Sequence, residues 1–146
     1  MTPAEKAAHA IFEIFTSGDY ERVHDLVTAD FVDHGAPPGL PPGPDGYIGV
    51  LRFLREGLQI RYELHDTVAA GDKIAIRATV HGVHNSDHLG VPATGKPYSM
   101  HTMHLYRAEG DRLAEHWGVR DEYGVLVQTG VLPPPSLPAG LAATAG

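Results

Sequence analysis

Apolar side chains recur every three or four residues in the N-terminal third of the chain, which is the spacing of an amphipathic helix. Ala8, Ile11, Phe12 and Phe15 form the first such stripe and predict a helix over residues 3–16. The same pattern predicts two further helices, which begin after Asp19 and after Asp45.

The predicted first helix also begins with residues that favour a helix N-terminus. Thr2 followed by Glu5 forms a capping box, and Pro3 fits the first helical position. After the second helix, a short extended piece is predicted at Phe31–His34. The run from 35 to 44 is rich in proline and glycine, so we expect a loop over the surface.

From Ile60 onward the apolar period shortens to two, which is typical of strands that bury one face. Four strands are predicted, and they pair as two consecutive hairpins with glycine-containing turns. Their ranges are residues 60–68, 73–84, 98–108 and 112–121.

Helices followed by a run of antiparallel strands indicate an α+β fold, with the helices packed on one face of a curved antiparallel sheet. Such an arrangement encloses a pocket between helices and sheet, where a small molecule would bind. We expect a single domain over residues 1–132. Residues 133–146 form a tail rich in proline, alanine and glycine that has little to bury.

Composition narrows the function classes. The 146 residues carry a formal net charge of −7, which argues against nucleic-acid binding. No apolar run approaches the ~20 residues that cross a bilayer, and no signal-peptide pattern is present, so we expect a cytoplasmic protein without membrane contact. The absence of cysteine excludes disulfides and thiolate chemistry, whereas ten histidines is a high count for this length.

The register of the last hairpin decides which side chains share a face. A turn centred on Gly110-Asp111 pairs Thr102 with Arg120, His104 with Gly118 and Tyr106 with His116. One face then carries polar side chains, namely Thr102, His104, Tyr106, His116 and Arg120. The other carries apolar ones, namely Met103, Leu105, Leu113, Trp117 and Val119.

Two interpretations of these faces stay open at this stage. The polar face is either exposed to solvent above a buried apolar face, or it is a cavity wall whose apolar back meets another subunit. The presence of His and Tyr at opposed positions, in place of Lys and Glu, favours the cavity.

The histidines also raise the possibility of a metal-dependent hydrolase. His81 with His84, and His101 with His104, have suggestive spacings. Residues three apart on a strand point to opposite faces, however, so these pairs do not chelate without a bulge. We therefore predict neither a metal site nor any cofactor. Phosphate-binding glycine loops and nucleophile elbows are also missing from the sequence.

Several motifs occur in an order and spacing that resemble the SnoaL-like polyketide cyclase (ester cyclase) family. The resemblance runs from about residue 5 to residue 132 and is strongest after residue 82. The motifs are Gly82-Val83-His84, Gly90-Val91-Pro92-Ala93-Thr94-Gly95-Lys96, His104-Leu105-Tyr106-Arg107, Glu115-His116-Trp117, and Asp121 with Leu126-Val127-Gln128-Thr129-Gly130.

The resemblance implies the cystatin-like cone shared with nuclear transport factor 2 relatives and ketosteroid isomerases. It also implies an apolar pocket, a homodimer or homotetramer formed through the sheet, and a place in antibiotic biosynthesis. The implied reaction is a cofactor-independent aldol ring closure of a polyketide ester. In it, a carboxylate removes a proton next to a carbonyl and the enolate attacks a second carbonyl.

Carried over by position, the active-site histidine of those cyclases falls on His104, and their pocket amide falls on or near Asp33. Their essential carboxylate falls on Gly118, which cannot move a proton. Three possibilities follow from this departure. Another carboxylate takes the role, with Asp33 or Asp121 the nearest candidates; the histidines do different chemistry; or the pocket binds a ligand without catalysis.

The candidate catalytic residues are therefore His104, Asp33 and Asp121, although the register places Asp121 on the face opposite His104. The favoured function is an enzyme acting on a small polyketide-type or ester-bearing molecule, and the alternative is a non-catalytic binding protein of the same fold. The candidate ligand-binding residues are His34, His84, Thr102, Tyr106, His116, Trp117, Gly118 and Arg120.

Overall fold

The computed structural model describes residues 1–141, and its first helix follows the sequence closely. Helix α1 (Pro3–Ser17) begins with the expected capping box, in which Thr2 and Glu5 each accept a hydrogen bond from the other's backbone amide. It ends at Gly18, whose φ of 71° is readily adopted only without a side chain.

The remaining elements are short helices and helical turns, and the strands of one sheet. The helical ones are a 3₁₀ turn η1 (Tyr20–Arg22), α2 (Val23–Leu26), α3 (Pro44–Arg52), a π-helical turn η2 (Phe53–Gly57) and α4 (Glu122–Gln128). The strands are β1 (Val27–Asp33), β2 (Arg61–Ala70), β3 (Lys73–Val83), β4 (Pro97–Glu109) and β5 (Arg112–Arg120).

The five strands form one sheet in the order β1-β5-β4-β3-β2. The pairs from β2 to β5 are antiparallel, as the hairpin pattern predicts. β1 differs from the predicted antiparallel sheet, because it lies parallel to β5 and makes the sheet mixed. It does so because the chain leaves α2 at the end of the sheet where β5 begins, with Val27 opposite Leu113.

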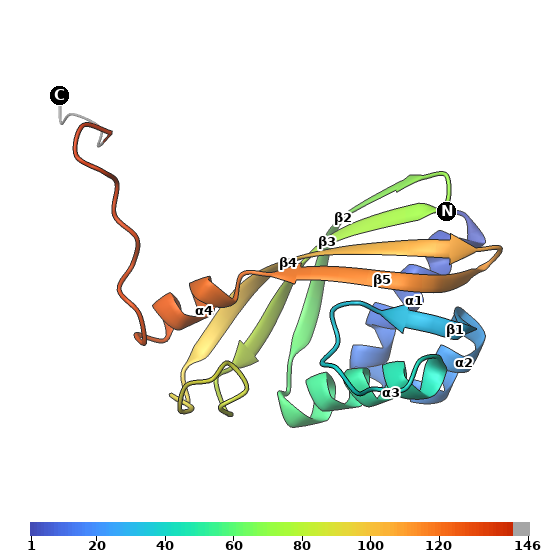
Figure 1. The fold of residues 1–146 in the computed structure, drawn as a ribbon, viewed down its shortest axis with the longest axis horizontal. Helices are drawn as coiled ribbons and strands as arrows, with labels where there is room; N and C mark the ends of the chain where they lie inside the picture. The colour runs from blue at the N-terminus through green and yellow to red at the C-terminus, as the bar shows by residue number, and fades with distance from the viewer. Residues whose placement is uncertain (142–146) are drawn as a thin grey trace.

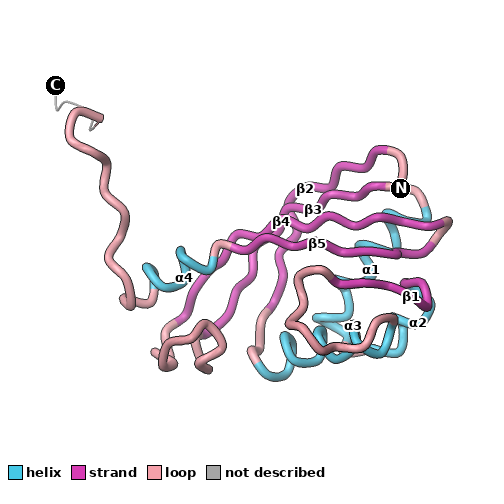
Figure 2. Tube along the Cα trace, in the orientation of Figure 1, coloured by secondary structure: helices cyan, strands magenta, loops and turns pink. Residues whose placement is uncertain are grey.

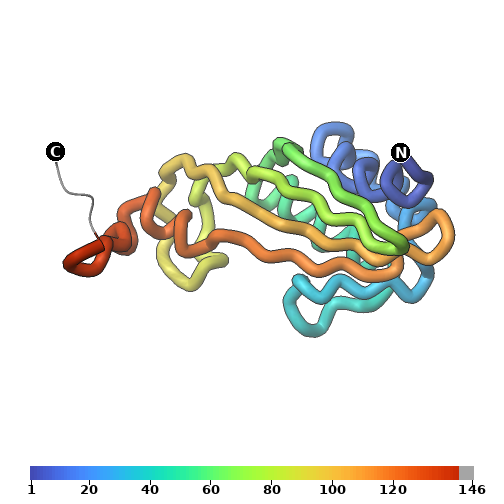
Figure 3. Tube along the Cα trace, turned by 90° about the horizontal axis from the view of Figure 1, so that it is seen from above, coloured from blue at the N-terminus to red at the C-terminus, as the bar shows by residue number. Residues whose placement is uncertain are grey.

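Helices α1, α2 and α3 cover one face of the curved sheet, and the other face is left uncovered in this chain (Figure 1). Seen from above, β1 and the proline-rich loop that follows it form the edge beside β5 (Figure 3). The α+β class and the helices packed on one sheet face are therefore confirmed. The buried core lies between the helices and the inner sheet face, and this position allows a cavity there.

The register of the last hairpin matches the prediction pair by pair: Thr102 with Arg120, His104 with Gly118, and Tyr106 with His116. The prediction for Leu113 is wrong. It was placed on the outer apolar face, but it is completely buried in the core. The cause is a bulge in the pairing between Arg107 and Ala108, which shifts the strand by one residue near the turn.

Helix α4 was not predicted from the sequence. Asp121 caps its start by accepting a hydrogen bond of 2.9 Å from the amide of Gly124. The helix is joined to β4, because Gln128 bonds the backbone of Ser99 through both ends of its amide. The chain from 133 to 141 then runs away from the body without regular structure (Figure 2), and 142–146 of the predicted tail lie outside the described residues.

Candidate active site

A cavity of about 630 Å³ lies between the helical layer and the inner face of the sheet. Most of its lining is apolar and comes from α1, α3, η2 and the proline-rich loop. The ring of His104 is one of the lining groups and the residue is only 5% exposed, so the polar face of the last hairpin is a cavity wall. The polar lining residues are Asp33, Tyr47, Tyr62, His88, Tyr98, His104, Tyr106, His116, Arg120 and Glu122.

Four side chains form a continuous hydrogen-bonded chain in this wall. Asp33 Oδ1 lies 2.8 Å from Nδ1 of His116, and Nε2 of His116 lies 3.0 Å from Nδ1 of His104. Nε2 of His104 lies 3.0 Å from the Thr102 hydroxyl, which donates to the backbone carbonyl of Ala78. β1 supplies the carboxylate, β5 supplies His116, and β4 supplies the other two side chains.

The direction of each bond in this chain assigns the protons. The single hydroxyl hydrogen of Thr102 goes to Ala78, so the hydroxyl accepts a hydrogen from Nε2 of His104. Burial, together with the nearby positive charges of His116 and Arg120, lowers the pKa of His104 to about 3, so its ring is neutral and Nδ1 accepts. His116 must then donate from both nitrogens, which makes it an imidazolium held between His104 and Asp33.

Asp33 is an ionised carboxylate with one oxygen left for a ligand. Burial acts to raise its pKa, but the hydrogen bond and charge of His116, the amide of Gly35 and the charge of Arg120 outweigh it, and the pKa lies below its usual value. Both hydrogen bonds go to Oδ1. Oδ2 accepts none from residues 1–141, and the residue lines the cavity.

Gly118 leaves the space beside the two histidines open. A Cβ built at this position would lie 3.2 Å from Cε1 of His116 and 3.7 Å from Nδ1 of His104. An aspartate here would therefore place its carboxylate against both rings. In this chain the carboxylate of Asp33 contacts the imidazole of His116 as well, but at Nδ1.

Arg120 connects the site to the proline-rich loop. Its guanidinium lines the cavity and donates a hydrogen bond of 3.3 Å to the carbonyl of Gly35. It also lies 3.8 Å from the carboxylate of Glu122. The side chain thus holds the loop at the cavity and adds positive charge near Asp33.

Two buried tyrosines form a second polar feature of the cavity. The hydroxyls of Tyr47 and Tyr106 lie 2.7 Å apart, and both residues are nearly inaccessible to solvent. Burial raises the pKa of each, and it raises the pKa of the neighbouring Tyr62 to about 12. All three phenols are therefore protonated at neutral pH. Neither Tyr47 nor Tyr62 was predicted as a site residue, and Tyr47 belongs to the apolar stripe of the helix after Asp45.

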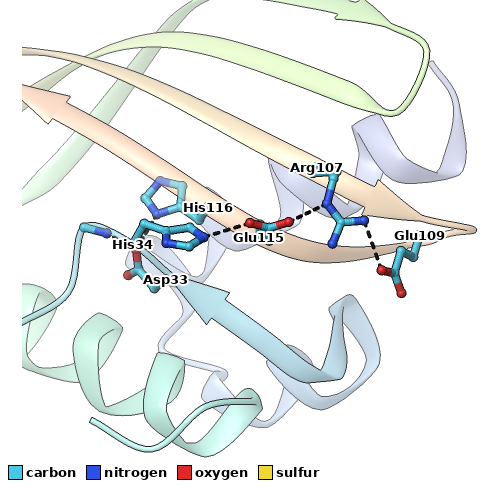
Figure 4. A network of polar contacts seen from close by, with 7 residues as sticks. Asp33, His34, Arg107, Glu109, Glu115 and His116 are labelled. Carbon is cyan, nitrogen blue, oxygen red and sulfur yellow. Dashed lines mark hydrogen bonds and ion pairs between the residues drawn. The ribbon is translucent and has the colours of Figure 1, made fainter. Parts of the chain in front are cut away.

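His34 and Trp117 lie on the outer face of the sheet, away from the cavity. Their rings stack with centroids 4.9 Å apart and planes 9° apart. His34 also contacts Glu115, which continues the network to Arg107 and Glu109 (Figure 4). The figure shows Asp33 and His34 adjacent in the chain, with Asp33 toward His116 and His34 toward Glu115.

His84 and Asp121 also lie outside the cavity lining. Nδ1 of the fully buried His84 accepts a hydrogen bond of 3.3 Å from the amide of Thr94, so this residue anchors the loop after β3. Asp121 serves as the cap of α4. The structure thus brings together Asp33, Thr102, His104, Tyr106, His116, Gly118 and Arg120, and it separates His34, His84, Trp117 and Asp121 from them.

One histidine pair with metal-like spacing, His101 and His104, is divided between the two faces of β4. His104 is buried in the cavity wall whereas His101 is exposed on the opposite face of β4. Within residues 1–141, no group of three or more His, Asp or Glu side chains is arranged to hold a metal ion. The helices of this part of the chain are also too short or too polar to cross a lipid bilayer.

Comparison with known proteins agrees with the fold. The family described as SnoaL-like polyketide cyclase matches residues 5–129, so the chain belongs to that family. Wild-type IdmH of Streptomyces antibioticus is 32% identical, with a TM-score of 0.72 over 87% of this chain and 98% of its own. TsrD of Streptomyces laurentii shares the fold, with a TM-score of 0.76 at 23% identity over 89% of this chain and 96% of its own.

A curated relative has a stated activity. Aklanonic acid methyl ester cyclase DauD of Streptomyces sp. strain C5 is 22% identical over 134 residues, which cover 89% of this chain and 83% of that protein. The family predicted from the sequence motifs is therefore confirmed, and it is a family of polyketide cyclases.

Proposed function

We propose that this protein closes a ring in a polyketide-type ester by cofactor-independent acid/base chemistry, with Asp33 as the group that moves the proton. The observation that supports this most strongly is the chain from Asp33 through His116 and His104 to Thr102, set in the wall of an apolar cavity. It gives the carboxylate that Gly118 does not supply.

The reaction keeps every atom of the substrate. Oδ2 of Asp33 takes a proton from a carbon next to a carbonyl, and the electrons of that C–H bond form the enolate. The enolate carbon attacks a second carbonyl of the same molecule, and the resulting alkoxide takes the proton back from Asp33. A bound substrate excludes water from Oδ2 and makes the carboxylate a stronger base.

The histidines act as positioning residues in this scheme. The imidazolium of His116 fixes Oδ1 of Asp33 and balances its charge, so that Oδ2 faces the substrate. His104, whose own Nε2 is fixed by Thr102, holds the second nitrogen of that imidazolium. Orienting groups of this kind keep a proton-moving group in a productive geometry.

The cavity lining favours one class of substrate. Apolar side chains surround most of the cavity and the polar groups gather on one wall, which suits a largely apolar molecule with a few oxygen functions. DauD and its counterpart DnrD of Streptomyces peucetius are aklanonic acid methyl ester cyclases, and their likeness to this chain supports an ester of that kind.

The test is ring closure of aklanonic acid methyl ester by the purified protein, followed by chromatography and mass spectrometry. Turnover by the wild type and a fall of about 10²-fold in His104→Ala would support the proposal. Equal turnover by the variant would rule out the role of His104. Tight binding of the ester with no turnover would favour the alternative, a binding protein that lost catalysis at Gly118.

We further propose that the uncovered sheet face packs against a second copy of the chain. Val119 and Met103 are 72% and 50% exposed there, and Leu105 and Trp117 lie beside them. Large apolar side chains in a contiguous patch are costly to leave in water. Light scattering should give a dimer or tetramer, and Val119→Lys should shift it toward the monomer; a monomeric wild type would contradict this.

A further inference from the structure

The hydroxyls of Tyr47 and Tyr106 form a buried pair that is not part of the hydrogen-bonded chain from Asp33 to Thr102. Tyr47 comes from α3 and Tyr106 from β4, so the two side chains meet between helix and sheet, where both line the cavity. Their oxygens are 2.7 Å apart, and the residues are 4% and 1% exposed. Both therefore lie deep in the wall, beyond the reach of bulk water.

One of the two hydroxyl hydrogens of the pair is not used in the hydrogen bond between the tyrosines. Two hydroxyls carry two hydrogens, and the bond between them takes one. The other has no acceptor among residues 1–141. A buried donor without a partner destabilises the folded protein, so this position favours a ligand that brings an acceptor. Burial holds the pKa of both phenols above the usual value, so the hydrogen stays in place at neutral pH.

The donor lies next to the proposed base. Tyr106 is paired with His116 across β4 and β5, and their ring centroids are 4.6 Å apart. His116 in turn holds Asp33. An oxygen bound by the tyrosines would therefore lie near the carboxylate that faces the same cavity. A fixed donor placed where negative charge develops stabilises an enolate.

We propose that the Tyr47–Tyr106 pair donates a hydrogen bond to a carbonyl oxygen of the ligand, and that the protein therefore selects ketones and esters over hydrocarbons of the same shape. The catalytic meaning of this contact rests on the proposed function, but the binding preference does not. Tyr47 and Tyr106 become ligand-binding residues in addition to those identified from the sequence.

The test compares two rigid probes, 9-fluorenone and fluorene, which differ at the bridging carbon. Fluorenone has no hydrogen on the carbons next to its carbonyl, so it binds without reacting. Calorimetric titration of the wild type should give a three- to tenfold lower Kd for the ketone, about the value of one hydrogen bond. The preference should disappear in the double variant Tyr47→Phe/Tyr106→Phe; an unchanged preference there would overturn the proposal.

Tyr20→Phe is the matched control. Tyr20 is also a buried tyrosine, but its hydroxyl bonds Glu56 outside the cavity lining, so its loss should leave the ketone preference intact. If the double variant does not fold, the infrared carbonyl band of fluorenone bound to the wild type decides. A shift to lower frequency than in hexane supports a donor, and an unshifted band overturns the proposal.

Asp33→Asn separates this inference from the proposed function. That variant should lose ring closure while keeping the preference for fluorenone, because the carboxylate is not part of the donor pair. Ring closure retained in Asp33→Asn would contradict the proposed function alone. Absence of the ketone preference in the wild type would contradict the donor pair alone.

Discussion

Asp33 Oδ1 lies 2.8 Å from Nδ1 of His116, although 83 positions separate the two residues in the chain. The parallel pairing of β1 with β5 explains the contact, because it sets these two residues opposite each other. Partners in a ladder project from the same face of a sheet, so both side chains turn toward the helices. The carboxylate thereby joins two histidines in a cavity that is otherwise mostly apolar.

The protonation of His116 is the first prediction. Donation to Asp33 and to His104 requires hydrogens on both ring nitrogens, so ¹⁵N NMR of histidine-labelled protein at pH 7 should show a doubly protonated ring. His84 is an internal reference, because the amide of Thr94 makes its Nδ1 an acceptor and leaves the hydrogen on Nε2. A His116 ring with one bare nitrogen would contradict the assignment.

The hydroxyl of Thr102 is predicted to stabilise the folded protein. Thr102→Val keeps the shape but removes the acceptor for His104, leaving a buried N–H without a partner at a cost of about 1–3 kcal/mol in the free energy of unfolding. Thr102→Ser keeps the hydroxyl and serves as the control. Urea denaturation should show the loss in the valine variant only; equal stability of both variants would argue against the bond.

His104 should make stability depend on pH. Its folded pKa of about 3 lies below the ordinary value, so the unfolded chain binds a proton more readily than the folded one once the pH falls below about 6.5. Its contribution is complete above that pH and is lost as the pH falls toward 3. Between pH 7 and pH 4.5 the loss should be roughly 2–3 kcal/mol.

His104→Gln is the variant that isolates this effect. Glutamine has both a donor and an acceptor but does not titrate, so the variant should lose less stability than the wild type between pH 7 and pH 4.5. Urea denaturation at both pH values measures the difference. Parallel curves for the two proteins would show that His104 does not carry the dependence.

Moving the carboxylate from position 33 to position 118 tests whether a carboxylate at either position supports ring closure. The double variant Asp33→Asn/Gly118→Asp returns a carboxylate to the same pair of imidazoles, since the Cβ at 118 would lie within 4 Å of both rings. We expect it to recover ring closure by about tenfold or more over Asp33→Asn alone. Gly118→Ala/Asp33→Asn, which adds the Cβ without the charge, should recover nothing; equal rates in both double variants would exclude a shared role.

Local pattern was sufficient to predict the faces of the last hairpin. The short turn at Gly110 fixed the register, and alternation then placed Thr102 and His104 on one face. The bulge near the turn was invisible in that pattern, because one extra residue reverses the side of Leu113 without changing the alternation around it. Leu113 therefore lies in the core while its predicted neighbours stay outside.

The contact between Asp33 and His116 lay beyond sequence reasoning for a different reason. It depends on a parallel pairing across the whole fold, and parallel strands leave no short turn by which to set a register. The motif comparison named Asp33 and Asp121 as replacements for the carboxylate at Gly118. Only the tertiary structure separates them, with Asp33 in the cavity and Asp121 at the cap of α4.

The rate of ring closure in Asp33→Asn tests the central claim most directly. Asparagine preserves the size of the side chain and removes its ability to take a proton. With aklanonic acid methyl ester at saturation, kcat should fall by about 10²-fold or more while the Kd for the ester changes little. A kcat close to that of the wild type would show that another group moves the proton.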